Sequence, residues 1–223
     1  MKELHILVCS DLHGSPEALD MLEAAVSADK YELLVACGDF TTFGSTDYTK
    51  EFLSRISIKI LAVPGNCDIP DNVAVLEQAD ASIHNMRAKV GGWQFFGFGG
   101  GLPTNMGMPF EIEESLMERS LRAVAVPEAI MVTHMPSYGM NDIARSGRNA
   151  GSKGILRIAQ EFKPVLALAG HYHESRGKVI SKDTTFVNPG PAKKGFYASV
   201  RVGEVVEVDF HEVRQDTAKP TMF

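Results

Sequence analysis

The stretch LHILVCSDLHGSPEALDMLEAAVSA, residues 4–28, decides the fold class. Its first seven residues form a short apolar run of strand length, and a polar turn follows. Ser15 then predicts a helix N-cap with Pro16 at the first helical position. Apolar side chains recur at helical spacing over the rest of the stretch, at Ala18, Leu22, Ala25 and Val26. The stretch therefore predicts a strand that runs directly into a helix.

The same theme continues along the first third of the chain. We predict a second strand over residues 31–39, a helix over 47–56 and a third strand over 56–66. The strands are almost continuously apolar and alternate with helices. This pattern is typical of a parallel sheet whose two faces are both covered.

Beyond residue 80 the pattern changes and then returns. Residues 81–100 predict antiparallel strands, whereas the later segments repeat strand and helix and end in two hairpins; the expected ranges are 111–124 (helix), 129–134 (strand), 152–162 (helix), 165–173 (strand), 178–190 and 196–213 (hairpins). Two half-chains that each supply strands predict two packed sheets flanked by helix layers. Without repeats or linkers, we expect a single domain over residues 1–223, with the last ten or so residues mobile.

Composition limits the function. The chain has 223 residues, 44% hydrophobic and 22% charged, which is ordinary for a soluble globular protein. Its formal charge of −6 argues against general nucleic-acid binding, so an anionic substrate would need local positive charge from a metal or a helix end. Three cysteines without a CxxC pair suit a reducing compartment. The N-terminal apolar run is too short for a signal peptide or a membrane span, and we expect a cytoplasmic protein.

Seven polar side chains fall where apolar strands end. Every one lies at the carboxyl end of a predicted strand: Asp11, His13, Asp39, Asn66, His134, His171 and His173. In α/β sheets this edge is where ligands bind, because loops converge there. Each residue taken alone also fits a turn or a buried core histidine. The seven residues lie in five separate segments of the chain, however, and that explanation must hold for every segment. His5, His84 and His211 follow no such strand, and we interpret them as structural or solvated.

The spacing of these residues suits a pair of metal ions. In extended chain, residues two apart point the same way, so Asp11 and His13 would grip one ion. His171 and His173 would serve neighbouring ions, which lie about 3.5–4 Å apart in two-metal sites. The two oxygens of Asp39 would bridge them. Such a mixed oxygen and nitrogen shell suits Mn, Fe, Ni or Zn.

Five ordered segments resemble a known family: SDLHG (10–14), CGDF (37–40), PGNCD (64–68), THMP (133–136) and GHYHE (170–174). They look like the five blocks of the calcineurin-like metallophosphoesterases, over roughly residues 9–174. VNPG (187–190) also resembles the binuclear phosphodiesterase branch of that family. The resemblance implies an α/β fold built as a four-layer α/β/β/α sandwich, with two packed mixed sheets between helices.

The resemblance also implies the chemistry. One metal would be held by Asp11, His13, Asp39 and His173, and the other by Asp39, Asn66, His134 and His171. Two divalent ions, Mn first with Fe, Ni or Zn as alternatives, would supply a metal-bridging hydroxide for in-line attack on a small-molecule phosphate ester. Catalysis would depend on Asp39, Asn66 and His134. The alternatives are a catalytically silent scaffold for protein interaction and, more remotely, a nucleotide-binding regulator.

Cys67 departs from the family pattern. Many relatives carry a histidine after this asparagine, where it touches the phosphate and helps the leaving group gain a proton. A thiol with a pKa near 8.5 is a poor replacement as an acid. Asp68 would support the turn. A cysteine-phosphatase reading fails because no arginine stands six residues beyond any cysteine. We therefore expect activated phosphodiesters to be cleaved better than alkyl phosphomonoesters.

The sequence leaves more than one interpretation for each of two loops. The glycine-rich residues 97–103 lack the ending of a phosphate-binding loop and favour a flexible turn. The alternative is an edge of the active site, with Thr104 or Asn105 in contact with substrate. The polar residues 138–154 fit either a substrate loop that uses Arg145 or Arg148, or a solvated connection.

Overall fold

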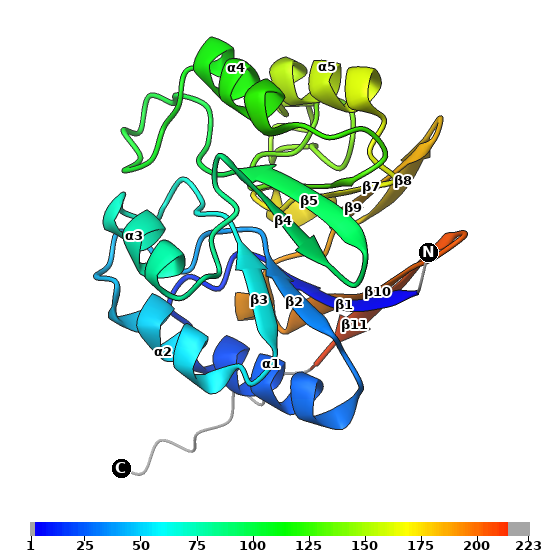
Figure 1. Cartoon of the computed structure of the whole chain (residues 1–223). Coiled ribbons are helices and arrows are strands. Elements are labelled where there is room, and N and C mark those ends of the chain that lie inside the picture. The colour runs from blue at the N-terminus through cyan, green and yellow to red at the C-terminus, as the bar shows by residue number, and fades with distance from the viewer. Residues whose placement is uncertain (1–2, 214–223) are drawn as a thin grey trace.

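Two β-sheets lie face to face in the computed structural model, which describes residues 3–213, and helices cover the outer face of each sheet (Figure 1). The first sheet has the order β11 (Val206–Glu212), β10 (Phe196–Val202), β1 (Leu4–Cys9), β2 (Leu33–Ala36) and β3 (Lys59–Ala62). The second has the order β4 (Met86–Val90), β5 (Trp93–Phe98), β6 (Ile130–Thr133), β7 (Leu166–Leu168), β9 (Thr184–Asn188) and β8 (Gly177–Ser181). The predicted mobile tail lies outside the described residues.

Both sheets are mixed. In the first, β1, β2 and β3 are parallel, and β10 pairs with β1 in the antiparallel sense. In the second, β5, β6, β7 and β9 are parallel, while β4 and β8 are antiparallel edge strands. The predicted two-sheet α/β sandwich is therefore confirmed, as are the two C-terminal hairpins.

Alternation along the strands builds the core. In β1, Leu4, Ile6 and Val8 point between the two sheets, whereas Leu7 and Cys9 point outward to the helices. All five are fully buried. Burying a side chain of the Leu, Ile or Val type is worth about 1.5–3 kcal/mol relative to exposure, so this strand anchors two layers at once.

The helices form the two outer layers. Figure 1 shows α1 (Pro16–Ala28), α2 (Asp47–Arg55) and α3 (Asp71–Gln78) on the side of the first sheet, with α4 (Glu114–Val124) and α5 (Lys153–Phe162) over the second. The predicted cap at Ser15 is confirmed, because its side chain accepts a hydrogen bond from Ala18 N at 3.2 Å. Sequence reasoning missed α3, which is too short for a clear period and buries only Asn72 and Leu76.

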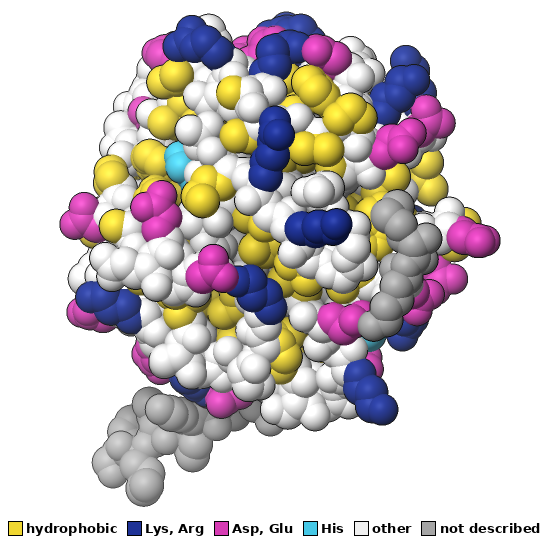
Figure 2. All heavy atoms as spheres, in the orientation of Figure 1, with side chains coloured by type: hydrophobic (Ala, Val, Ile, Leu, Met, Phe, Trp, Pro, Cys, Tyr) yellow, Lys and Arg dark blue, Asp and Glu magenta, His cyan; other side chains and the backbone are white. Residues whose placement is uncertain are grey.

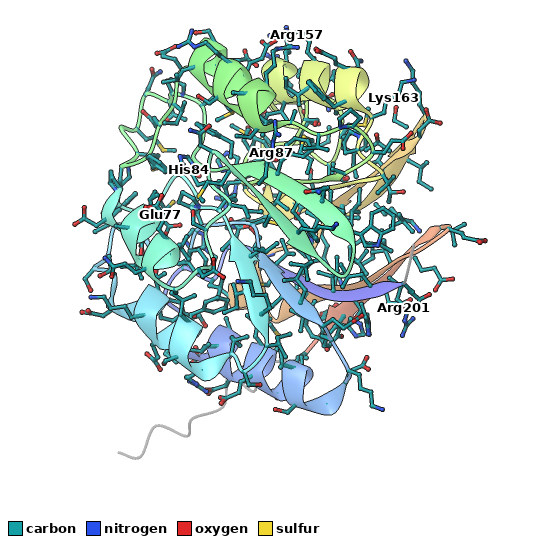
Figure 3. All side chains as sticks on the ribbon, viewed as in Figure 1. Glu77, His84, Arg87, Arg157, Lys163 and Arg201 are labelled. Atoms are coloured by element: carbon teal, nitrogen blue, oxygen red, sulfur yellow. The ribbon has the colours of Figure 1, made fainter. Side chains whose placement is uncertain are left out.

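One arginine joins a strand of the second sheet to the end of a helix. Arg87 on β4 lies beside α4 (Figure 3) and donates hydrogen bonds to the carbonyls of Val124 at 2.8 Å and Ala123 at 3.1 Å. These carbonyls have no partner inside the helix, so the guanidinium satisfies the helix end.

The molecular surface carries charges of both signs. On the face in Figure 2, lysine and arginine side chains are interspersed with aspartate and glutamate. Among the described residues, none of the helices combines the length and the apolar character that crossing a bilayer requires.

Candidate metal centre

The carboxyl ends of five strands from both sheets converge on one site. The loops after β1, β2 and β3 bring three carboxylate or amide side chains and the imidazole of His13, and those after β6 and β7 bring three more imidazoles. All seven predicted ligands meet there: Asp11, His13, Asp39, Asn66, His134, His171 and His173. A shared metal centre requires Asp39 to lie near the histidines of the second sheet, and its Oδ1 lies 3.6 Å from His134 Nε2.

One half of the site surrounds an oxygen of Asp11. His173 Nε2 lies 3.2 Å from Asp11 Oδ1, and His13 Nε2 lies 3.9 Å from the same oxygen. His13 Nε2 also lies 3.6 Å from Asp39 Oδ2. These four side chains are the first metal set that the family resemblance implies.

The other half surrounds the amide oxygen of Asn66. His134 Nε2 lies 2.9 Å from Asn66 Oδ1, and His171 Nδ1 lies 2.8 Å from it. Asp39 Oδ1 faces this group, at 3.6 Å from His134 Nε2. Asp39 thus turns one oxygen to each half, as a bridging ligand requires.

Buried polar atoms without partners test whether a cation fits here. Within residues 3–213, Asp11 Oδ1 and His13 Nε2 are buried and make no hydrogen bond. A buried polar atom left unpaired costs about 1–3 kcal/mol, more if it is charged. Carboxylate oxygen and imidazole nitrogen are both ligand atoms for divalent transition metals. In each of the groups Asp11–His13–His173 and Asp11–Asp39–His134, the potential ligand atoms all lie within 4.8 Å of one another. The residues therefore fit a metal centre.

Hydrogen bonds behind the ligands fix their orientation. His134 Nδ1 donates to the carbonyl of Cys37 at 2.7 Å, so that in the neutral imidazole the lone pair is on Nε2, which faces the site. His13 Nδ1 contacts Thr42 Oγ1 at 2.8 Å. The backbone N–H of His171 donates to Asp11 Oδ2 at 3.1 Å, which links ligand loops of the two sheets.

The backbone of the ligand loops differs from the extended chain we expected. Asp11, His13, Asp39 and His171 have positive φ values of 57°, 50°, 56° and 69°. The left-handed region costs a non-glycine residue roughly 1–2 kcal/mol. The extended geometry is therefore wrong for these ligands: tight turns aim them inward instead. Such strain is typical of functional sites, where surrounding contacts enforce it.

Two buried side chains hold the ligand loops in place. The Asp68 carboxylate accepts hydrogen bonds from the backbone N–H groups of Gly65 at 2.8 Å, Thr41 at 2.9 Å and Phe40 at 3.2 Å. It thereby joins the loops after β2 and β3, beyond the local turn that the sequence suggested. Asn188 in the VNPG segment donates to the carbonyls at the His171 loop, at 3.0 Å to Tyr172 O. Sequence reasoning gave Asn188 no such role.

Burial sets the protonation of the ligands. It lowers the pKa of His13 to about 4 and, together with the neighbouring His134, that of His171 to about 3. Burial alone would raise the pKa of Asp11, but the nearby imidazoles, His173 first, outweigh it and hold that pKa below its ordinary value. Neutral His13 and His171 beside an ionised Asp11 are in the forms that bind metal.

A cleft of about 490 Å³ opens over the site. Its floor includes His13, Asp39 and Asn66, and Cys67 lies beside them. Further lining comes from two loops and the segment after His171: Met106, Met108, Ala144, Arg145, Ser146, Tyr172 and Glu174. Arg145 thus lies at the cleft, with its Nε 2.8 Å from Glu174 Oε1, whereas Arg148 does not line it.

The three histidines that we set aside lie elsewhere. His84 packs against Phe98 and accepts a hydrogen bond from Gly99 N at 2.9 Å. His5 packs on Tyr31, and His211 stacks on Tyr197.

The fold and the site define a class: an α/β two-sheet protein with a cluster of aspartate, histidine and asparagine at the strand ends. The sequence model of the calcineurin-like phosphoesterase family matches residues 4–175. The chain belongs to that family. The resemblance inferred from the five motifs is thereby confirmed.

Individual relatives agree with this assignment. "Uncharacterized protein MJ1162" of Methanocaldococcus jannaschii is 32% identical over 221 residues, covering 95% of this chain and 99% of that protein. The crystal structure of TT1561 of Thermus thermophilus superposes with a TM-score of 0.73 at 18% identity, over 96% of this chain and 100% of the other. The structure of a novel archaeal phosphodiesterase superposes with a TM-score of 0.56 at 16% identity, over 93% of this chain and 100% of the other. These two structures establish the fold.

Proposed function

We propose that the protein is a metal-dependent phosphodiesterase that acts on small-molecule phosphate esters. The observation that carries this proposal is Asp39, whose Oδ2 lies 3.6 Å from His13 Nε2 while its Oδ1 lies 3.6 Å from His134 Nε2. One carboxylate between two ligand groups is the arrangement that a two-metal centre needs. Membership in a phosphoesterase family supports the same chemistry.

Two sets of side chains would hold the ions. Asp11, His13, His173 and Asp39 form one set, and Asp39, Asn66, His134 and His171 form the other. Two divalent cations bound there would supply charge neutralisation for the phosphoryl oxygens and would lower the pKa of water for in-line attack. The protein, with a formal charge of −6, would then present local positive charge to an anionic ester.

The chain's own residues orient this chemistry. The Cys37 carbonyl fixes the tautomer of His134, and Asn66 lies between His134 and His171. Tyr172 donates from its hydroxyl to Ala150 O at 2.7 Å. The floor of the cleft is therefore held rigid before substrate arrives, which is the requirement for electrostatic preorganisation.

The cleft lacks a suitable proton donor among its described lining residues. Its imidazoles, His13, His171 and His173, all belong to the ligand sets. Burial raises the pKa of Tyr172 to about 12 and raises that of the Cys67 thiol, while the hydrogen bond from Arg145 lowers the pKa of Glu174. A leaving group must therefore depart without general-acid help, which favours activated esters.

The shape of the cleft supports a diester. Met106 and Met108 come from one lining segment, while Ala144, Arg145 and Ser146 come from another. With about 490 Å³ available, both alcohol groups of a small diester can be accommodated around one phosphorus.

Hydrolysis of bis-p-nitrophenyl phosphate tests the proposal. Protein stripped with a chelator should be inactive, and restoring Mn, Ni, Zn or Mg in turn should restore turnover with at least one ion. Asp39→Asn should lose about 10³-fold or more in rate, because its amide cannot bridge two ions. Absence of turnover with every ion would overturn the proposal and favour the silent scaffold.

A further inference from the structure

A third group of potential ligands lies at the cleft floor and includes the sulfur of Cys67. A ring nitrogen of His13, a carboxylate oxygen of Asp39 and Cys67 Sγ lie within 4.8 Å of one another. The His13 side chain is only 10% exposed, and its Nε2 makes no hydrogen bond within the described part of the chain. A buried nitrogen without a partner therefore lies in the same group as the thiol.

The position of the Cys67 sulfur is well constrained. The residue is 8% exposed and lines the cleft. Its backbone N–H donates to Asp39 Oδ1 at 2.8 Å. Asn66 Nδ2 lies 3.6 Å from the sulfur. Cys67 is thus held against a proposed bridging ligand.

The other two cysteines offer an internal comparison. Cys9 and Cys37 are fully buried in the apolar layers and line no part of this cleft. Within residues 3–213, neither belongs to a group of potential ligands. Their sulfurs are ordinary core atoms, so the placement of Cys67 is not a general property of the cysteines in this chain.

We propose that Cys67 Sγ is a direct ligand of the cation held by His13 and Asp39, so that this half of the centre is a mixed nitrogen, oxygen and sulfur site. The inference rests on the metal centre of the proposed function and adds a residue to it. As the sulfur–metal bond forms, the thiol proton passes to bulk solvent. The residue that replaces the family's histidine thus acquires a role of its own.

The geometry allows this bond with a small movement. Sulfur and nitrogen ligands of one tetrahedral zinc ion are roughly 3.5 Å apart, given bond lengths of about 2.3 and 2.0 Å. A group spread over at most 4.8 Å reaches that geometry by contracting about 1 Å.

A sulfur ligand changes which metals the centre prefers. Thiolate is a soft ligand that favours zinc, iron and cobalt, whereas an all oxygen and nitrogen shell also suits manganese. The proposal therefore replaces the expectation of manganese, at this half of the centre, with zinc or another thiophilic ion.

Cobalt spectroscopy tests the bond directly. Chelator-stripped protein is loaded with Co²⁺, its cobalt content is measured, and the near-ultraviolet region is searched for a sulfur-to-cobalt charge-transfer band. We expect the band in the wild type and in the control Cys9→Ala, and we expect Cys67→Ser to lose it while it still binds cobalt. Two bound cobalt ions without the band would overturn this proposal alone, whereas protein that binds no cobalt would overturn the metal centre itself.

Thiol protection provides a second readout in the unaltered protein. Cys67 is the cysteine that reaches the cleft, so iodoacetamide should label it first in metal-free protein, as peptide mapping would reveal. Saturating Zn²⁺ should slow this labelling by about tenfold or more, because a coordinated sulfur is not a free nucleophile. Equal labelling rates with and without bound zinc would contradict the proposal. When Zn²⁺ and Mn²⁺ compete for the centre, the ratio of Zn²⁺ affinity to Mn²⁺ affinity should be about tenfold smaller in Cys67→Ser than in the wild type.

Discussion

Asp39 lies directly against the backbone of Gly65. A Cβ placed on Gly65 would come within 2.0 Å of Asp39 Oδ1 and within 2.3 Å of Asp39 N. The glycine in PGNCD is therefore needed for space, because it lets the loop after β3 approach the proposed bridging carboxylate. Its role is steric, beyond the turn chemistry that the sequence suggests.

Gly65→Ala should displace Asp39 and disrupt the site. Overpacking a buried position costs about 1–3 kcal/mol, and a contact this short with backbone and carboxylate should reach the upper end. We expect a lower free energy of unfolding in urea and loss of bound metal in elemental analysis. The control is Gly44→Ala, whose Cβ would make an ordinary contact at 3.6 Å from Thr41. Full metal content in Gly65→Ala would contradict the steric argument.

Asp68→Asn should weaken the link between the loops after β2 and β3. The amide would turn a donor toward backbone N–H groups that now donate to a carboxylate, among them those of Gly65 and Thr41. Hydrogen bonds to a charged group are worth about 1.5–3 kcal/mol, so we expect a loss of that order together with weaker metal binding.

A second buried carboxylate supplies the control for Asp68. Asp142 accepts hydrogen bonds from the N–H groups of Gly139 and Gly151, both at 2.9 Å, and neither partner is a proposed ligand. Asp142→Asn should lose a similar amount of stability, measured by urea unfolding, and keep its metal. If both variants kept their metal equally well, Asp68 would be a purely structural residue.

The leaving group should control the rate of ester cleavage. Without a general acid in the cleft, the departing alkoxide gains no proton in the transition state, a form of help worth roughly 10²–10⁴ in rate. We therefore expect kcat/KM to fall steeply from aryl to alkyl phosphodiesters, and alkyl phosphomonoesters to be poor substrates. The measurement is a series of diesters graded by the pKa of the leaving alcohol. Similar rates for aryl and alkyl esters would refute this expectation.

His84 should make stability depend on pH. Burial lowers its pKa from 6.5 to about 4, so the unfolded chain takes up the proton first as the pH falls. The free energy of unfolding should therefore decrease between about pH 6.5 and pH 4, by up to roughly 3 kcal/mol from this residue, and stay level above that window.

His84→Asn isolates this effect. The asparagine side chain keeps an acceptor for the Gly99 N–H, which now donates to His84 Nδ1 at 2.9 Å, but it does not titrate. The free energy of unfolding in urea is measured for both proteins at each pH. The difference between the wild-type value and the variant value should change with pH as the histidine contribution does. Parallel curves from pH 7 to pH 4 would show that His84 is not protonated on unfolding.

Much of the fold could be predicted because it is encoded locally. Ser15 and Pro16 mark the start of α1 within a few residues of chain, and the alternation in β1 assigns side chains to its two faces. The short helix α3 escaped prediction because its eight residues carry too little periodicity. The two-sheet architecture followed from the order of strands and helices.

The candidate site could be predicted in its membership but not in its geometry. The seven side chains were found because each follows an apolar strand, and parallel strands end at a common edge. Their left-handed backbones at Asp11, His13, Asp39 and His171 were not foreseen, since the residues are not glycines. Asn188 was missed because its partners, Gly170 O and Tyr172 O, are brought to it only by sheet pairing.

The amino-acid sequence by itself determined the order of the elements, the identity of the polar groups at the strand ends and the family, because these depend on short-range pattern. Only the tertiary structure decided which groups meet: His171 N reaches Asp11 Oδ2 across 160 positions, and Asp39 turns one oxygen to each half of the site. It also placed the Cys67 sulfur beside His13 and Asp39. The physical reason is that packing of the two sheets brings distant loops to one edge, and no local pattern encodes that approach.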